Sequence, residues 1–386
     1  MAINTISATN LPATPNNGRT TCRDSGSKLH VVYSRSDGVT RHIYYKSSAD
    51  NGVTWVGEVK LTAGVKDYAY ASIAVDSFDN LHVSFKNVTN NKLGYVKYTV
   101  GVGWGAQHDF LIAVNGIASN AISVGNDDSI FIAYRGSVLT NWWMWVRSED
   151  GGATWTAEQT VNWGPDSYLC INTAPDTYGY IHIIISTDIF TILYWRFNLT
   201  TDLIDISATK LSPVANMHYE PDITCTPGGR VIVVWETSTN QIYWTYNDNN
   251  GLGTPGFGWL VSVGITTITL GRQYQPSIAA VADNTYSLIW RYVDGGAIYQ
   301  VWGKEYAGAW GAEAKYTTEA LHVNGLRLTG SAYPVTAHFP AHYGYSYARE
   351  DGSYVNYDND SLGPIPPGPP TFGGGINRRD RPYRRF

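Results

Sequence analysis

The amino-acid sequence predicts an all-β protein, a seven-bladed β-propeller, and three observations lead to this fold. The 386 residues include 39 glycines and only three methionines, and 13% of them are aromatic. Runs rich in Val, Ile, Thr and Tyr alternate with a period of two, which is typical of strands joined by tight turns. One apolar strand motif recurs about every 50 residues, a spacing that suits four-stranded propeller blades.

The repeated motif is the second strand of each predicted unit. Its copies lie at 29–33, 81–85, 130–134, 181–185, 231–235 and 286–290, with a weaker seventh copy at 343–347. A shorter strand and a turn precede each copy, an aromatic strand follows it, and a polar fourth strand ends most units, as at 58–62 and 206–213. One such sheet cannot bury both of its faces alone, so stacking around an axis is expected.

The N-terminal segment is expected to close the ring. The seventh unit lacks a fourth strand, and ISATNLP at 6–12 reads almost like the fourth strand ISATKLSP at 206–213. We therefore expect residues 6–12 to lie alongside the strand near 353–358. The predicted propeller domain spans residues 1–360.

Residues 361–386 form a segment of different composition, an extended C-terminal arm. A proline run favours extended polyproline II, a glycine run provides a hinge, and the end carries five arginines against one aspartate. Nucleic-acid binding is disfavoured because the arm is short and the rest of the chain is acidic. The sequence indicates docking on other protein subunits, through Arg378, Arg379, Arg381, Tyr383, Arg384, Arg385 and Phe386.

Hydropathy, the N-terminal segment and the cysteines indicate what kind of environment the protein is suited to. No apolar run reaches the roughly 18 residues needed to cross a bilayer, so no membrane insertion is expected. The opening MAINTISATNLP shows no evident signal peptide. Cys22, Cys170 and Cys225 do not have metal-ligand spacing and are expected to be buried, reduced thiols. No cofactor and no metal is expected.

Two of the units carry a sharper motif after the third strand, S-x-D-x-G-x-T-W. This motif resembles the Asp-box of the bacterial neuraminidase repeat, which occurs in sialidases, other glycan-cleaving propellers, seven-bladed lectins and phage virion proteins. The resemblance implies a structural hairpin at the blade periphery, in which Asp accepts turn amides, Gly takes a positive φ and Trp packs into the blade. The motif residues are Ser48, Asp50, Gly52, Thr54 and Trp55 in one copy and Ser148, Asp150, Gly152, Thr154 and Trp155 in the other.

The same resemblance implies where a site would lie, at the axial mouth before the first strands. A sialidase-like site uses three arginines on a carboxylate, a tyrosine nucleophile with a glutamate base, and an aspartic acid. The matching candidates are Arg19, Arg272 and Arg327 for the arginines, Tyr219 or Tyr274 with Glu220 for the nucleophile pair, and Asp67 for the acid. A polysaccharide lyase using His218 and a nearby tyrosine is a further alternative.

Other observations favour a structural or binding role. The Arg-Ile-Pro tripeptide that marks the sialidase N-terminus is absent, and the pattern at Tyr219 recurs at Tyr274 (YEPDI, YQPSI), which suits repeat packing. His30, His82 and His182 fall at one point of the repeat, on different blades, so a repeat-core role is favoured over a metal site.

The sequence thus favours a non-catalytic binding or structural propeller over an enzyme. We expect it to contact glycans and to be anchored by its arm to a larger assembly, such as a phage virion decoration or tail component. The alternative is a sialidase-like glycoside hydrolase or a polysaccharide lyase acting at the axial mouth.

Overall fold

The structure of the chain is a computed structural model. It describes residues 3–7, 19–50, 52–110, 117–136, 142–162, 168–187, 191–212, 218–239, 241–252, 254–255, 258–266, 273–293, 299–315, 323–328, 344–349 and 354–358. These residues form strands and no helix, as the alternating apolar pattern predicts. None of the described segments could therefore cross a membrane as a long apolar helix.

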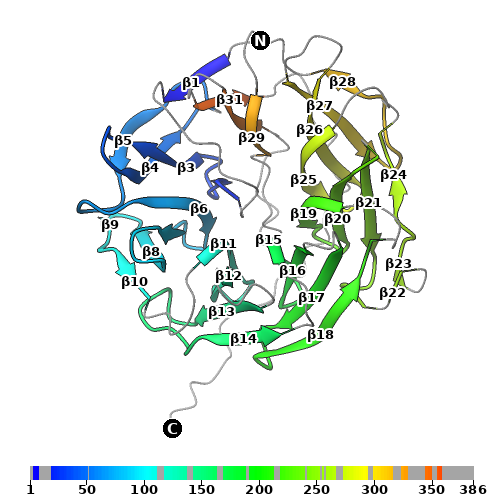
Figure 1. The fold of residues 1–386 in the computed structure, drawn as a ribbon, viewed down its shortest axis with the longest axis horizontal. Helices are drawn as coiled ribbons and strands as arrows, with labels where there is room; N and C mark the ends of the chain where they lie inside the picture. The colour runs from blue at the N-terminus through cyan, green and yellow to red at the C-terminus, as the bar shows by residue number, and fades with distance from the viewer. Residues whose placement is uncertain are drawn as a thin grey trace.

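Six consecutive sheets stand side by side around a central axis (Figure 1). Blade 1 contains β2 (Thr21–Arg23), β3 (Leu29–Ser36), β4 (Arg41–Ser48) and β5 (Val56–Lys60). Blade 2 contains β6 (Tyr68–Val75), β7 (Leu81–Asn87), β8 (Lys92–Thr99), β9 (Gly103–Trp104) and β10 (His108–Asp109). Blade 3 contains β11 (Ile117–Val124), β12 (Ile130–Gly136), β13 (Trp142–Ser148) and β14 (Gln159–Asn162).

The next three blades continue the order of the chain. Blade 4 contains β15 (Tyr168–Pro175), β16 (Tyr180–Thr187), β17 (Ile192–Asn198) and β18 (Leu203–Lys210). Blade 5 contains β19 (His218–Cys225), β20 (Val231–Thr237), β21 (Ile242–Asn247), β22 (Thr254–Pro255), β23 (Gly258–Trp259) and β24 (Val263–Gly264). Blade 6 contains β25 (Gln273–Ala282), β26 (Thr285–Val293), β27 (Tyr299–Ala307) and β28 (Ala314–Lys315).

The predicted count of seven blades is corrected to six. Among the described side chains, five apolar clusters lie between successive sheets and pack blades 1 to 6 together. A further sheet combines β1 (Ile3–Ser7) with β29 (Val323–Leu328), β30 (Gly344–Arg349) and β31 (Tyr354–Asp358). Only the backbone of this sheet is described, and the count of six rests on the blades whose side chains are described.

The N-terminal strand pairs with the last strand of the chain. β1 runs antiparallel to β31, with Ile3 opposite Tyr357 and Ser7 opposite Tyr354. The paired residues begin earlier than the predicted 6–12, and residues 8–12 lie outside the described part of the chain. This pairing joins the two ends of the propeller domain within one sheet.

The second strand of each blade is buried on both faces, and its alternate residues serve two neighbouring clusters. In β12, Phe131 and Ala133 pack toward blade 4, whereas Ile130 and Ile132 pack toward blade 2. This explains why apolar residues of the repeated motif occur on both faces of the strand rather than on alternate positions only. The free thiols of Cys22, Cys170 and Cys225 are also buried, as expected.

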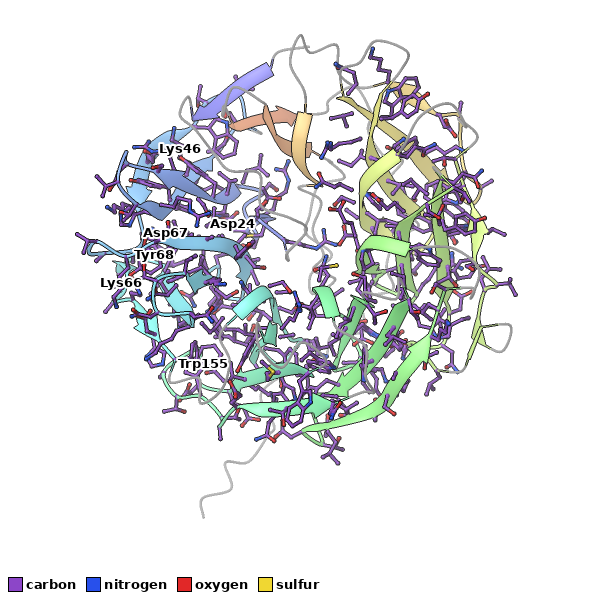
Figure 2. The ribbon with its side chains drawn as sticks, viewed as in Figure 1. Asp24, Lys46, Lys66, Asp67, Tyr68 and Trp155 are labelled. Atoms are coloured by element: carbon purple, nitrogen blue, oxygen red, sulfur yellow. The ribbon has the colours of Figure 1, made fainter. Side chains whose placement is uncertain are left out.

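An aromatic contact between blades recurs at the periphery. The Tyr45 ring of blade 1 meets Trp104 of blade 2 edge-on at 4.9 Å, and Tyr95 of blade 2 meets Trp155 of blade 3 at 4.9 Å. Figure 2 shows Trp155 on the outer part of the ring. The same contact joins Tyr194 of blade 4 to Trp259 of blade 5 and Trp244 of blade 5 to Trp310 of blade 6, so tryptophans that follow the third strands of blades 2, 3, 5 and 6 pack on the preceding blade.

The strand order gives the ring two different faces. Because neighbouring strands are antiparallel, the turns from first to second strand and from third to fourth strand lie on one side, here called the turn face. First strands begin and second strands end on the other side, here called the mouth face.

The turn face is tied together by hydrogen bonds between successive blades. Ser25 donates its amide and hydroxyl to Asp79 at 2.7 and 2.6 Å, and Ser77 donates the same two groups to Asp128 at 2.9 and 2.7 Å. The links continue through the Asn126 amide to the Thr177 carbonyl, the Thr177 hydroxyl to the Pro227 carbonyl, and the Gly228 amide to Asp283.

The two S-x-D-x-G-x-T-W turns lie on this face and have closely similar geometry. Asp150 accepts the Thr154 amide and hydroxyl at 2.8 and 2.6 Å, and Ser148 accepts the Gly152 amide at 2.8 Å. Gly152 has φ +93°. The corresponding Asp50 accepts the Thr54 amide and hydroxyl at 2.8 and 2.5 Å. These bonds, first the one from the Thr54 hydroxyl, lower the pKa of Asp50 to about 2.

Candidate functional site

The centre of the ring is occupied by a buried arginine. Arg19, 8% exposed, donates from Nη2 to the Ile223 carbonyl at 2.8 Å and to the Ile278 carbonyl at 3.1 Å. The same nitrogen lies 4.0 Å from Oδ1 of Asp222, which is 1% exposed. The segment before β2 therefore bonds across the axis to the first strands of blades 5 and 6.

Polar groups of the first strands continue this network. Asp222 accepts from Asn172 Nδ2 at 2.6 Å, from the Ser277 hydroxyl at 2.8 Å and from the Ile278 amide at 2.9 Å. The hydroxyls of Ser123 and Thr173 lie 2.8 Å apart. A buried carboxylate with this many donors is a structural link between blades.

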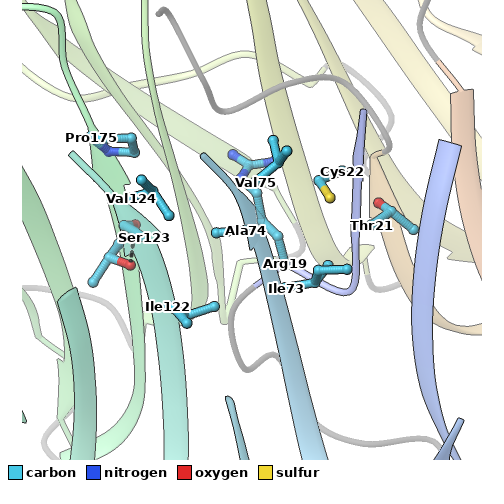
Figure 3. A pocket seen from close by; sticks show the side chains of 11 residues that line it. Arg19, Thr21, Cys22, Ile73, Ala74, Val75, Ile122, Ser123, Val124 and Pro175 are labelled. Atoms are coloured by element: carbon cyan, nitrogen blue, oxygen red, sulfur yellow. Dashed lines mark hydrogen bonds between the residues drawn. The ribbon is translucent and has the colours of Figure 1, made fainter. Parts of the chain in front are cut away.

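A small cavity lies beside Arg19. Its volume is about 30 Å³, and it is lined by β2, β6, β11 and β15, including Cys22, Ile73, Ile122 and Ser123 (Figure 3). Pockets that hold drug-sized ligands measure roughly 300–1,000 Å³. The cavity has room for about two water molecules and not for a sugar ring.

In blades 2, 5 and 6 the first strand has two residues opposite one near its start, at the mouth face. Tyr70 and Ala71 bulge between the paired positions 69 and 72, and the register shifts in the same way at Glu220 and Gln275. Tyr70, Glu220 and Gln275 have φ values of 57°, 43° and 51°. Left-handed backbone at a non-glycine residue is sparsely populated and recurs at functional sites.

In blades 5 and 6 the bulge residue Gln275 is bonded to charges at the ends of second strands. Its amide donates to Glu236 at 3.1 Å, and its side-chain oxygen accepts from Arg291 at 2.9 Å. Its side-chain nitrogen lies 3.5 Å from Glu220. Glu220 therefore belongs to a polar cluster at the mouth.

Asp67, the predicted general acid, forms an ion pair with Arg41. It accepts from Arg41 Nε at 2.9 and 3.1 Å and from Arg41 Nη2 at 2.5 Å. Hydrogen bonding to Arg41 lowers the pKa of Asp67, whereas a general acid requires a raised one. Figure 2 shows Asp67 beside Lys66 and Tyr68 on one side of the ring.

The other predicted site residues are described in part or not at all. Tyr219 and Tyr274 lie in β19 and β25 directly before the bulges, and Arg327 lies in β29; only the backbones of these residues are described. Arg272 falls outside the described residues. Of the sialidase-like set, the described side chains are Arg19, Asp67 and Glu220. Arg19 donates to the Ile223 and Ile278 carbonyls, Asp67 accepts from Arg41, and Glu220 lies beside Gln275.

Sequence reasoning missed Asp222, Gln275 and the charges at the mouth ends of second strands. The signal was present in the repeat alignment, because Lys86, Arg135, Glu236 and Arg291 all stand one residue after the apolar strand motif. Their positions opposite the bulges follow only from the register.

The three repeated histidines form matching buried networks. His82 Nδ1 lies 2.8 Å from the Tyr95 hydroxyl, and Nε2 lies 3.2 Å from Asp76. His30 joins Tyr45 and Asp24, and His182 joins Tyr194 and Asp176, with the same geometry. Their role in the repeat core is confirmed. No group of described residues gathers three potential metal ligands.

Comparison with known proteins confirms the type of fold. No family model matches the chain, and no curated protein matches it in sequence. It superposes on an ulvan lyase from a new polysaccharide lyase family, bound to –[GlcA(1-4)Rha3S]–, with a TM-score of 0.65 and 10% identity, over 92% of this chain and 96% of the lyase.

The NanB sialidase of Streptococcus pneumoniae gives a TM-score of 0.52 with 10% identity, over 93% of this chain and 71% of the sialidase. A Hadza microbial sialidase gives 0.50 with 11% identity, over 85% and 75%. The chain therefore has the β-propeller fold that sialidases and this lyase share.

Proposed function

We propose that this protein is a non-catalytic glycan-binding propeller whose ligand lies on the mouth face. The main support for this proposal is the position of the Arg19 side chain. Its guanidinium is buried on the axis and donates to two backbone carbonyls, so it serves the fold and is not displayed to a substrate carboxylate.

The state of Asp67 supports the non-catalytic part. A glycosidase acid must hold a proton near neutral pH, and the bidentate Arg41 contact favours the ionised carboxylate instead. Arg19 and Asp67 therefore lack the chemistry that a sialidase-like reaction requires of an arginine on the substrate carboxylate and of a general acid.

The glycan-binding part draws on the mouth face and on similar proteins. The described mouth carries cations and an aromatic ring close together, Lys86 and Tyr70, a combination suited to a sugar with an acidic substituent. The ulvan lyase was solved with a saccharide, and sialidases share the fold.

The alternative is an enzyme, and the likeness to a polysaccharide lyase over nearly the whole chain favours a lyase among the enzyme classes. The Glu220–Gln275–Arg291 cluster is where such chemistry would lie.

One experiment separates these functions. The protein is incubated with a panel of acidic polysaccharides and a fluorogenic sialoside, and both binding and product formation are followed. The proposal expects saturable binding without unsaturated uronate or released fluorophore. Turnover that Glu220→Gln abolishes would establish the enzyme instead.

We further propose that residues 361–386 anchor the propeller to protein subunits of a larger assembly, such as a phage particle. The proline and glycine run followed by arginines supports this role. Deletion of 361–386 is expected to leave the propeller folded and to remove it from the assembled particle fraction. A truncated protein that still assembles would contradict the proposal.

A further inference from the structure

Lys86 differs from its neighbouring cations in having no anionic partner among the described residues. Lys66 lies 3.6 Å from Asp109, Lys60 lies 3.5 Å from Asp37, and Arg41 is bidentate on Asp67. No described group accepts a hydrogen bond from the Lys86 ammonium. It stands over the Tyr70 ring at 5.9 Å from the ring centre.

The register explains this difference. Lys86 is paired opposite Ala69, the residue immediately before the bulge of blade 2. Glu236 and Arg291 occupy the equivalent positions in blades 5 and 6. In blade 6 the bulge residue Gln275 bonds these charges through its amide and side chain. In blade 2 the bulge residue is Tyr70, which offers a ring in place of an acceptor.

Positive charge gathers around Lys86. Its side chain is half-buried, and burial, followed by the nearby guanidiniums of Arg41 and Arg135, lowers the pKa of Lys86. Desolvated cations that repel one another gain when an anion enters between them. Asp67 forms its ion pair with Arg41.

The Tyr70 platform is held firmly. The Tyr70 carbonyl accepts from Asn120 Nδ2 at 2.8 Å, and the buried Asn120 accepts from the Ser84 hydroxyl at 2.6 Å. With φ at 57°, the bulge fixes where the residue projects from the strand. A ring presented on fixed backbone loses little entropy when a sugar packs on it.

We propose that Lys86 and Tyr70 form a binding subsite for an oxyanion substituent of a saccharide, a carboxylate or a sulfate ester, with the sugar ring against Tyr70. This inference rests on the proposed glycan-binding function and places its charged contact in blade 2. The ammonium donates hydrogen bonds to the oxyanion, and the tyrosine ring covers the apolar side of the sugar.

The test is calorimetric titration with three probes of similar length: oligogalacturonate for carboxylate, a sulfated dextran oligosaccharide for sulfate ester, and a neutral dextran oligosaccharide. We expect wild type to bind at least one charged probe and not the neutral one. Lys86→Gln is expected to weaken binding about tenfold or more, and Lys86→Arg to retain it within about threefold.

Lys66→Gln is the matched control, because it removes the same charge from a lysine on the same side that already faces Asp109. It is expected to change affinity less than about twofold. Tyr70→Gly removes the ring at a backbone position that glycine adopts readily, so the fold is kept while affinity falls.

The outcomes are distinguishable. If Lys86→Gln leaves the affinity for the charged probes intact, or if Lys66→Gln weakens it as much as Lys86→Gln does, the proposed subsite is wrong. The glycan-binding function is not affected by either result. A preference for the neutral probe does the same. Failure of wild type to bind any probe or any glycan of the panel overturns both proposals.

Discussion

The guanidinium of Arg19 lies 4.0 Å from the carboxylate of Asp222, and both side chains are buried where the first strands of the blades meet. The two residues are far apart in sequence, and the contact joins the start of blade 1 to blade 5. A second bond from Arg19 reaches the Ile278 carbonyl of blade 6. One side chain thus couples three blades across the axis.

Arg19→Met is expected to destabilise the fold by about 3 kcal/mol, because it leaves Asp222 as a buried charge without its cation. Urea unfolding followed by tryptophan fluorescence measures the change. Arg35→Met is the control, since Arg35 pairs with Glu58 where both side chains are partly exposed, and should cost no more than about 1 kcal/mol. Equal stability losses would argue against an axial role for Arg19.

Gly152→Ala is expected to cost more than Gly101→Ala. Both glycines have positive φ, +93° and +77°, so each substitution incurs about 1 kcal/mol of backbone strain. Only at Gly152 would the added Cβ meet another side chain, the Tyr95 hydroxyl at 2.2 Å, which adds about 1–3 kcal/mol. Thermal unfolding of the two variants compares them, and equal melting temperatures would mean that the turn does not pack on Tyr95.

The unfolding free energy is expected to fall as the pH is lowered from about 6.5 to 5. Burial lowers the pKa of His82 and of His30, so in this range the unfolded chain takes up protons that the folded protein refuses. Stability is therefore complete above the unfolded histidine pKa of 6.5 and declines below it, by at most about 1.4 kcal/mol per pH unit for each histidine.

Denaturation midpoints measured at several pH values follow this decline. His82→Asn should lower stability at pH 7 and flatten the slope, because it removes a buried neutral imidazole. A wild-type curve that is flat down to pH 5 would be incompatible with buried neutral imidazoles.

Deletion of residues 1–12 is expected to lower the melting temperature by about 5 °C or more, because β31 loses its antiparallel partner β1. Calorimetry of this variant and of one lacking 361–386 makes the comparison. If both deletions have the same small effect, the pairing of the chain ends contributes little to stability.

Much of the fold could be predicted from sequence because the second strands are buried on both faces and therefore repeat as apolar runs. LHVSF at 81–85 is one such run, and β7 begins at its first residue. The blade count did not follow from the repeats alone, because the weak copy at 343–347 falls in a sheet described only by its backbone.

The candidate site was harder to predict for a different reason. The resemblance assigned Arg19 and Asp67 to catalysis from their places before first strands, yet their partners, the Ile223 carbonyl and Arg41, come from other parts of the chain. Lys86 stands beside Tyr70 because a bulge at Tyr70 and Ala71 offsets the register by a residue, and the sequence did not indicate that bulge.

Native mass spectrometry of the protein mixed with an acidic oligosaccharide that it binds tests the central claim most directly, because it weighs the bound sugar. The account predicts a complex whose saccharide keeps its full mass after prolonged incubation. Bound or released fragments of the saccharide would show catalysis and contradict the account.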